Sequence, residues 1–321
     1  MIISRTPLRM SFVGGGTDLP LFYEKSQGAV ISTAINKYVY ITVNHRFDHT
    51  IRISYSQTEI VEHISDVHHD RCREVMREVG VDSGIEITSI ADIPAGTGMG
   101  SSSSFTVGLF NALHGFCGRV QTAHQLAEQA CKLEIDTLKA PIGKQDQYAA
   151  AFGGLHRYLF NSDGSVFVDP VLCSPGRQRS FFNHLMLFYV GGTRDASLVL
   201  GEIKPSEDNH LHRLRELVDV FWLGLTGDKD IRELGEVLDC GWQCKKKMSG
   251  GISNPTIDNY YEAAKRAGAL GGKLLGAGGT GFLLFFCEPD KQDAVRNSLN
   301  GLRQIEFAHA PEGSKIIYVG G

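Results

Sequence analysis

Polar and hydrophobic positions alternate early in the chain and recur at helical spacing further on. From Val39 to Val43 every second side chain is aliphatic, a period typical of a half-buried strand. Residues 66–79 instead carry apolar side chains three and four positions apart and are followed by Gly80. This second pattern predicts a helix that ends at a left-handed glycine.

The remaining apolar pattern predicts a mixed order of helices and strands. A strand at 85–90 leads through a glycine-rich loop into a helix that ends near Gly118. Thr122 and Gln125 have the spacing of a capping box, so we expect the next helix to start there and to run to about Leu138. Further strands are expected at 185–190, 273–275, 282–287 and 316–319, and further helices at 211–225, 231–246, 256–267 and 291–299. This order predicts an α+β fold.

The chain length favours two lobes. At 321 residues the chain lies near the size at which one hydrophobic core gives way to two. Residues 161–179 contain glycines and prolines with little apolar period, so we expect the connection there. The division gives an N-terminal lobe at 1–170 and a C-terminal lobe at 180–321.

Composition and charge narrow the class of protein. A net charge of −4 gives no reason to expect a nucleic-acid partner, and the run Lys245-Lys246-Lys247 is typical of the solvated end of a helix. No apolar stretch reaches membrane-spanning length and no secretory signal is present, so we expect no membrane partner and a cytoplasmic location. The seven cysteines and twelve histidines lack the spacing of metal sites. An acidic ligand would need a local positive site.

The most informative segment is Pro94-Ala-Gly-Thr-Gly-Met-Gly-Ser-Ser-Ser-Ser104. Alternate glycines let the backbone approach an anion closely, and the serines begin a helix whose free N–H groups attract phosphate. A serine-rich helix start can be only a cap, and a glycine-rich turn only a turn. A glycine-rich turn that follows a strand and leads directly into a serine-rich helix start favours phosphate binding. The residues expected at the phosphates are Pro94, Gly96, Gly98, Gly100, Ser101, Ser102, Ser103 and Ser104.

Two common nucleotide-binding motifs are disfavoured. The GxxxxGK[ST] sequence of a Walker A loop does not occur in the chain. A GxGxxG match at 276–281 is followed by the strand-like sequence at 282–286. A dinucleotide site needs a helix at that point.

Two carboxylates are candidates for the chemistry. Glu134 extends the inward stripe of its helix, where it is either half of a buried salt bridge or a Mg²⁺ ligand. Asp146 precedes a helix of small residues, where it is either a cap or the general base that takes a proton from an attacking hydroxyl. Lys144 lies beside it and would hold charge. Near the N-terminus, Arg9 and Asp18 bracket a glycine-rich turn that suits either a polar ligand or a simple change of direction.

Three segments together resemble the signatures of the GHMP kinases, the galactokinase, homoserine, mevalonate and phosphomevalonate kinase superfamily. Residues 94–103 are similar to the second signature, PxxxGLGSSA, with Met99 for the usual Leu and Ser103 for the usual Ala. Residues 5–18 resemble the first signature and residues 273–286 the third. The three occur in order and span nearly the whole chain.

Four shorter stretches are most similar to the branch that phosphorylates D-glycero-D-manno-heptose 7-phosphate. They are GGGTDLP, AINKYVY at 34–40, GKQDQYAAAFGG at 143–154 and ISNP at 252–255. The resemblance implies an ATP-dependent sugar kinase that phosphorylates the anomeric hydroxyl of heptose 7-phosphate and makes the 1,7-bisphosphate. A kinase for an unphosphorylated sugar such as fucose or galactose stays open, as does a non-catalytic sensor of sugar and nucleotide with the same fold.

The resemblance also implies a fold and a set of roles. The N-terminal lobe would resemble domain 2 of ribosomal protein S5, with a left-handed β-α-β crossover, and the C-terminal lobe would be ferredoxin-like, with the active site between them. ATP and Mg²⁺ are the implied cofactors, Ser102 and Glu134 the metal ligands, and Asp146 the catalytic carboxylate, with Arg9 and Lys144 beside it. The residues expected at the sugar are Arg9, Gly15, Gly16, Thr17, Asp18, Asp146, Arg194, Gly278 and Gly279. A 7-phosphate on the acceptor would need cationic partners, for which Lys144, Arg194 and Lys273 are the candidates.

Overall fold

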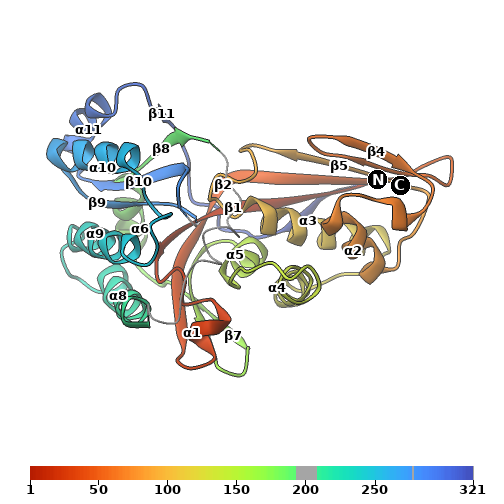
Figure 1. Cartoon of the computed structure of the whole chain (residues 1–321), viewed down its shortest axis with the longest axis horizontal. Coiled ribbons are helices and arrows are strands. Elements are labelled where there is room, and N and C mark those ends of the chain that lie inside the picture. The colour runs from red at the N-terminus through yellow and green to blue at the C-terminus, as the bar shows by residue number, and fades with distance from the viewer. Residues whose placement is uncertain (193–207, 277, 321) are drawn as a thin grey trace.

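The protein folds around two β-sheets (Figure 1). The computed structural model describes residues 1–192, 208–276 and 278–320. The larger sheet has eight strands and the smaller sheet has four. The two ends of the chain lie side by side at the far end of the larger sheet, where the Met1 amino group donates a hydrogen bond to the Gly320 carbonyl at 3.1 Å.

The larger sheet is built on two long strands. Its members are β1 (Ile2–Val13), β2 (Gly28–His45), β3 (Ile51–Ser54), β4 (Thr58–Val61), β5 (Ile85–Ala91), β6 (Leu155–Phe160), β7 (Val166–Pro170) and β12 (Lys315–Val319). The first part of β2 pairs with β6 and the last part with β5, so the sheet branches along this strand. The predicted alternation in β2 is confirmed, because Val39, Ile41 and Val43 are all buried.

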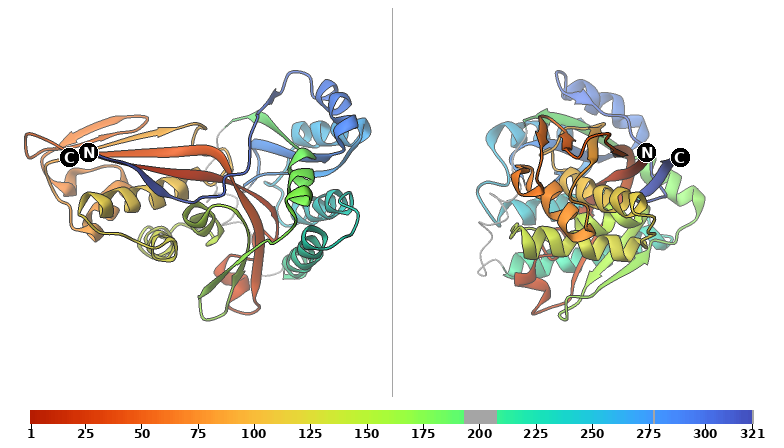
Figure 2. Two further views of the ribbon diagram at one scale, coloured as in Figure 1. Left: turned by 180° about the vertical axis from the view of Figure 1, so that it is seen from behind. Right: turned by 90° about the vertical axis from the view of Figure 1, so that its right-hand side faces the viewer.

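Four helices cover one face of the larger sheet (Figure 2). They are α2 (Asp70–Val79), α3 (Ser101–Phe116), α4 (Ala123–Cys131) and α5 (Gln145–Phe152). The central helix is α3, which lies on β1 and β2 and buries Val107, Leu109 and Phe110 completely. Its apolar stripe therefore fixes where its N-terminus points.

The helix ends follow the sequence signals. Gly80 ends α2 in the left-handed region at φ 80°, and Thr122 starts α4 with a complete capping box to Gln125. The helix then continues as a π-helical turn at Lys132–Thr137, which the sequence pattern did not indicate. Such turns are common at functional sites, and this one carries Glu134.

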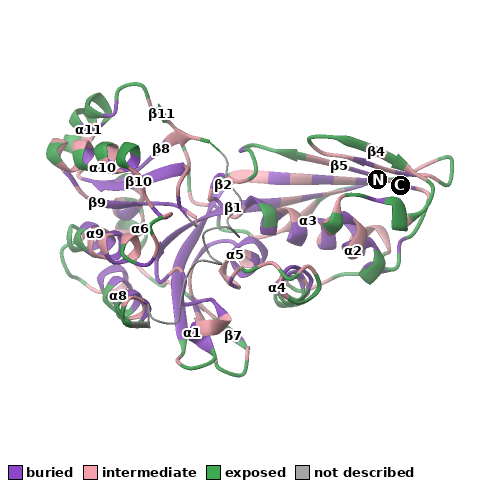
Figure 3. Ribbon diagram, viewed as in Figure 1, coloured by how far each residue is buried: buried purple, intermediate pink, exposed green. Residues whose placement is uncertain are grey.

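The smaller sheet has the order β11-β8-β10-β9. Its strands are β8 (Leu185–Gly191), β9 (Ala269–Leu274), β10 (Gly281–Cys287) and β11 (Arg303–Gln304), and its helices are α8 (Asp208–Thr226), α9 (Glu233–Lys246), α10 (Pro255–Ala267) and α11 (Gln292–Ser298). The central strand β10 is buried along its whole length, as Figure 3 shows. The predicted α+β order is confirmed. Among all described residues, no helix has the length and apolar character needed to cross a bilayer.

Two expectations about chain organisation need correction. Residues 161–179 form more than a connection, because Val166–Pro170 pairs with β6 as strand β7, and Ser174 then caps helix α6 (Pro175–Asn183). The last strand, β12, pairs with β1 in the larger sheet, although its residues fall in the range 180–321. Pairing across the whole sequence is not visible in a local apolar pattern. The division at 170–180 into two lobes stays a prediction.

Helix α9 lies directly against β9 because a glycine permits it. A Cβ on Gly271 would lie 1.9 Å from the Gly235 carbonyl oxygen, well inside van der Waals contact. The close approach holds the first two turns of α9 on the sheet, and Lys245 is in the last turn of the same helix. This last turn reaches the cavity described below.

We predict that Gly271→Ala lowers the free energy of unfolding by about 2–3 kcal/mol, because the backbone of α9 would have to move away. Gly250→Ala is the control, since Gly250 is exposed and a Cβ there meets nothing within 4 Å. Urea denaturation measures both changes. Equal, small effects of the two substitutions would contradict the packing described for Gly271.

Candidate active site

A cavity of about 680 Å³ lies between elements of the two sheets. Residues of all three glycine-rich segments line it, namely Gly15 and Gly16 of the first, Gly96, Gly98, Gly100, Ser101, Ser102 and Ser103 of the second, and Gly276, Gly278 and Thr280 of the third. Arg9 on β1 and Asp146 in α5 face it from the larger sheet, and Lys273 on β9 faces it from the smaller one. Motifs far apart in the sequence are therefore brought together at one site.

The phosphate loop has the backbone conformation that the sequence predicts. Gly96, Gly98 and Gly100 have φ angles of 76°, 82° and 72°, a region that side-chain-bearing residues rarely adopt. The loop leads into α3 at Ser101, and no described side chain caps the first N–H groups of this helix. These N–H groups and the helix dipole therefore remain for an anion.

The serines at the start of α3 have different surroundings. Ser102 is exposed and lines the cavity, whereas Ser103 is buried and donates a hydrogen bond to Glu134 at 2.7 Å. Ser104 donates to the Pro7 carbonyl at 2.8 Å and, like Pro94, does not line the cavity. Ser102 is therefore the serine hydroxyl with the freest access to a ligand.

The third glycine segment supports the loop from the other sheet. A Cβ on Gly276 would lie 2.4 Å from the Gly98 Cα atom, so the two backbones are in direct contact. Gly276 also has a positive φ of 75°. The GxGxxG match was predicted to be a poor dinucleotide site because no helix follows it. The structure agrees, since strand β10 begins at Gly281.

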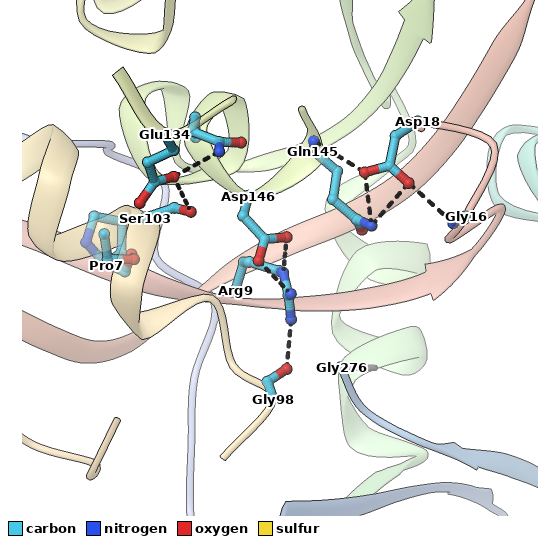
Figure 4. A network of polar contacts seen from close by, with 12 residues as sticks. Pro7, Arg9, Gly16, Asp18, Gly98, Ser103, Glu134, Gln145, Asp146 and Gly276 are labelled. Carbon is cyan, nitrogen blue, oxygen red and sulfur yellow. Dashed lines mark hydrogen bonds and ion pairs between the residues drawn. The ribbon is translucent and has the colours of Figure 1, made fainter. Parts of the chain in front are cut away.

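Arg9 joins the phosphate loop to Asp146 (Figure 4). Its Nε and Nη2 donate to Oδ1 and Oδ2 of Asp146 at 2.8 and 2.7 Å, and its Nη1 donates to the Gly98 carbonyl at 2.6 Å. Arg9 is 5% exposed, so this fork is largely shielded from water. Both Asp146 oxygens face Arg9, and the carboxylate does not act as a cap of α5. The fork fixes the carboxylate beside the loop.

Asp18 lies close enough to Asp146 to sense its charge, and it is almost fully buried. It accepts hydrogen bonds from the Gly16 N–H at 2.9 Å and from the Gln145 amide group at 3.1 Å. Burial raises the pKa of Asp18, the Gly16 N–H lowers it, and the nearby Asp146 charge raises it again. The Gln145 side-chain oxygen has no partner among the described residues. This corner therefore offers a carboxylate and a free amide oxygen to a polyol.

Glu134 is completely buried and accepts four hydrogen bonds. Ser103 and Gln147 donate to Oε2 at 2.7 and 2.6 Å, and Thr106 and Arg71 donate to Oε1 at 2.8 and 3.1 Å. The expected buried salt bridge is present, because Arg71 is the cationic partner. Arg71 also lines the cavity, so its movement would open Oε1 to a ligand there.

Family models match the chain on both sides of this cavity. The model of the GHMP kinases N terminal domain matches residues 67–154, and the GHMP kinases C terminal model matches residues 222–302. Together they cover 169 of the 321 residues. The chain belongs to the GHMP kinases. As a GHMP kinase it is a phosphotransferase, and ATP is the phosphate donor that the family implies.

Matches to similar proteins cover nearly the whole chain of this GHMP kinase. The D-glycero-alpha-D-manno-heptose 7-phosphate kinase of Campylobacter jejuni is 28% identical over 338 residues, which cover 98% of each chain. The L-fucokinase/L-fucose-1-P guanylyltransferase of Bacteroides fragilis is 27% identical, with 97% of this chain matched to 36% of that protein. A D-glycero-D-manno-heptose 1-phosphate kinase from Bacteroides thetaiotaomicron has a TM-score of 0.82 at 24% identity, with both chains covered completely. The GHMP kinase fold is thereby confirmed.

Several predicted site residues lie elsewhere in this GHMP kinase. The Lys144 ammonium donates to the Gly164 carbonyl at 2.6 Å, stacks over Tyr23 and does not line the cavity. Thr17 is fully buried and holds the N-terminal turn by donating to the Gly14 and Ala29 carbonyls. Gly278 lines the cavity and Gly279 does not, and Arg194 lies outside the described residues.

The sequence missed Lys245. It was expected at a solvated helix end, but it lines the cavity and donates to the Gly276 carbonyl at 2.5 Å. Burial and, to a smaller extent, the Arg9 charge lower the pKa of Lys245 to about 8, although Asp18 and Asp146 act in the opposite direction. Burial also lowers the pKa of Lys273 well below its ordinary value, and the Lys245 charge adds to this effect. Helix α9 packs on β9, and this tertiary contact, which the sequence pattern does not indicate, brings the two lysines to one cavity.

The lowered pKa of Lys245 predicts a pH dependence of stability. Between pH 8 and pH 10.5 the unfolded chain binds a proton at Lys245 that the folded protein has lost, so the free energy of unfolding rises with pH in this window. We predict that Lys245→Met reduces this rise by about 1–2 kcal/mol. Denaturation at pH 7.5, 9 and 10.5 measures it. Lys246→Met is the control, because the Lys246 ammonium pairs with the partly exposed Asp258. A rise of wild-type size in Lys245→Met would contradict the prediction.

Proposed function

We propose that this GHMP kinase transfers the γ-phosphate of ATP to the anomeric hydroxyl of a heptose 7-phosphate and releases the 1,7-bisphosphate and ADP. The observation that carries the proposal is the Arg9 fork, which holds a carboxylate beside the phosphate loop in one cavity. The acceptor is inferred from the Campylobacter jejuni relative, whose match covers 98% of both chains.

In the proposed reaction the anomeric oxygen attacks the γ-phosphorus while the bond from that phosphorus to the ADP oxygen breaks. Asp146 accepts the proton of the attacking hydroxyl, and Arg9 keeps its carboxylate in place. The free N–H groups at the start of α3 hold the triphosphate and stabilise the charge of the transition state. Positioning and charge stabilisation supply most of the acceleration, because phosphoryl transfer asks little covalent work of the protein.

The residues fit a magnesium ion under one condition. Ser102 offers an exposed hydroxyl, and Glu134 offers a carboxylate once Arg71 releases Oε1. These two side chains would hold Mg²⁺, with the remaining positions taken by phosphate oxygens and water. The ion would neutralise charge on the β- and γ-phosphates.

The sugar hydroxyls are proposed to lie near the corner formed by the N-terminal turn. Asp18 and the Gln145 oxygen would accept their hydrogen bonds, and Gly15 and Gly16 leave room for the ring to approach the backbone. Lys144 takes no part, because its ammonium is bound to Gly164. We also infer a cytoplasmic location, which agrees with seven free cysteines and with the need for ATP.

We predict that Asp146→Asn lowers kcat by about 10²–10⁴-fold, because the variant keeps the size of the side chain and loses the proton acceptor. The Kd for ATP, measured by calorimetry, should change little, since the loop N–H groups are intact. Asp290→Asn, an exposed position, is the control. Near-normal turnover of Asp146→Asn would remove this residue from the mechanism.

A panel of acceptors tests the function as a whole. The rate of ADP release should be highest with heptose 7-phosphate and lower with free heptose, fucose and galactose. The Bacteroides fragilis relative keeps a fucose kinase open as the second candidate, and a clear preference for fucose would replace the proposed acceptor. ATP binding without ADP release on any acceptor would instead indicate a non-catalytic sensor.

A further inference from the structure

Two lysines enter the cavity from the smaller sheet and its helices. Lys245 is on the last turn of α9, and Lys273 is on β9 and only 7% exposed. Both line the cavity that also contains the phosphate loop and Asp146. We propose that Lys245 and Lys273 together bind the phosphate group that the acceptor already carries, so that they select a phosphorylated sugar. The inference rests on the proposed function and deepens it.

Each ammonium group has donors to spare. The Lys245 Nζ donates to the Gly276 carbonyl at 2.5 Å, and the Lys273 Nζ donates to the Phe12 carbonyl at 2.9 Å. An ammonium group has three N–H donors, so each lysine retains two for a ligand. Among the described residues neither lysine forms an ion pair, and both partners are neutral backbone oxygens.

The two carboxylates that line the cavity are hydrogen-bonded to groups other than these lysines. Asp146 is held by both nitrogens of the Arg9 fork, and Asp18 accepts from Gly16 and Gln145. Asp18 still attracts both lysines from a distance, and Asp146 attracts Lys245. No described carboxylate is therefore placed to neutralise the two ammonium groups directly.

Repulsion and burial make this pair costly without an anion. Burial lowers the pKa of both lysines, Arg9 repels both, and Lys245 also repels Lys273. Buried charges in proteins are normally paired, and a phosphate dianion would pair with both at once. The Thr280 hydroxyl is a further donor, because it lines the same cavity, is buried and has no partner among the described residues.

The alternative role for these lysines is mechanical. Lys273 joins β9 to β1, and Lys245 joins α9 to the loop at Gly276. Such links would support every substrate equally. If the lysines form a phosphate subsite, their substitution would instead weaken the binding of the phosphorylated acceptor more than that of the other acceptor. Binding of the nucleotide would change little, and this difference can be measured.

The test compares heptose 7-phosphate with the same heptose lacking phosphate, with KM measured for each acceptor and for ATP. Lys245→Met and Lys273→Met should each raise KM for heptose 7-phosphate by about 10- to 100-fold, the loss expected for a charge-assisted hydrogen bond. KM for ATP should rise less than about threefold, so the preference for the phosphorylated acceptor shrinks. Lys273→Arg should restore part of it. Lys246→Met, one residue away and paired with Asp258, is the control.

Each other outcome has a defined meaning. If the wild type prefers heptose 7-phosphate and both methionine variants keep that preference, the lysine assignment is overturned and the proposed function stands. If the wild type shows no preference for the phosphorylated sugar, both are overturned. An equal rise in KM for ATP would assign the lysines to the nucleotide phosphates and overturn the subsite. Lys245→Met decides alone if Lys273→Met does not fold.

Discussion

The arginine fork at Arg9 is the interaction on which the site depends. One buried guanidinium fixes the phosphate loop through the Gly98 carbonyl and fixes Asp146 through both of its oxygens. Arg9 is itself anchored in β1, where its N–H donates to the Met99 carbonyl at 3.1 Å. The distance between loop and carboxylate is thus set by a rigid strand. Loss of the guanidinium would release the loop and leave a carboxylate without its donors.

The second sheet completes the site. The Gly276 backbone lies against Gly98, and Lys273 donates to the Phe12 carbonyl, so both contacts join the smaller sheet to the larger one. A side chain at either glycine would separate the backbones. The cavity therefore exists only when the two sheets are packed together. A cavity of this kind can combine an anion site from one sheet with cations from the other.

The sequence predicts the local parts of this arrangement well. The phosphate loop, the capping box at Thr122 and the end of α2 at Gly80 depend on neighbouring residues, and the structure has all three. The buried position of Glu134 also follows from its helix stripe.

The sequence analysis missed features that depend on tertiary contacts. Lys245 was assigned to solvent because three lysines in a row are usually exposed, but the contact of α9 with β9 turns it inward. The strand at 316–319 was predicted, but its pairing with β1 was not, because that partner is about 310 residues away in sequence, a separation beyond the reach of periodicity arguments.

The most direct test of this account is a crystal structure of the protein with a non-hydrolysable ATP analogue and heptose 7-phosphate. The account predicts triphosphate on residues 96–103, the anomeric hydroxyl on Asp146 and the 7-phosphate on Lys245 and Lys273. Triphosphate bound away from the loop, or an acceptor out of reach of Asp146, would contradict it.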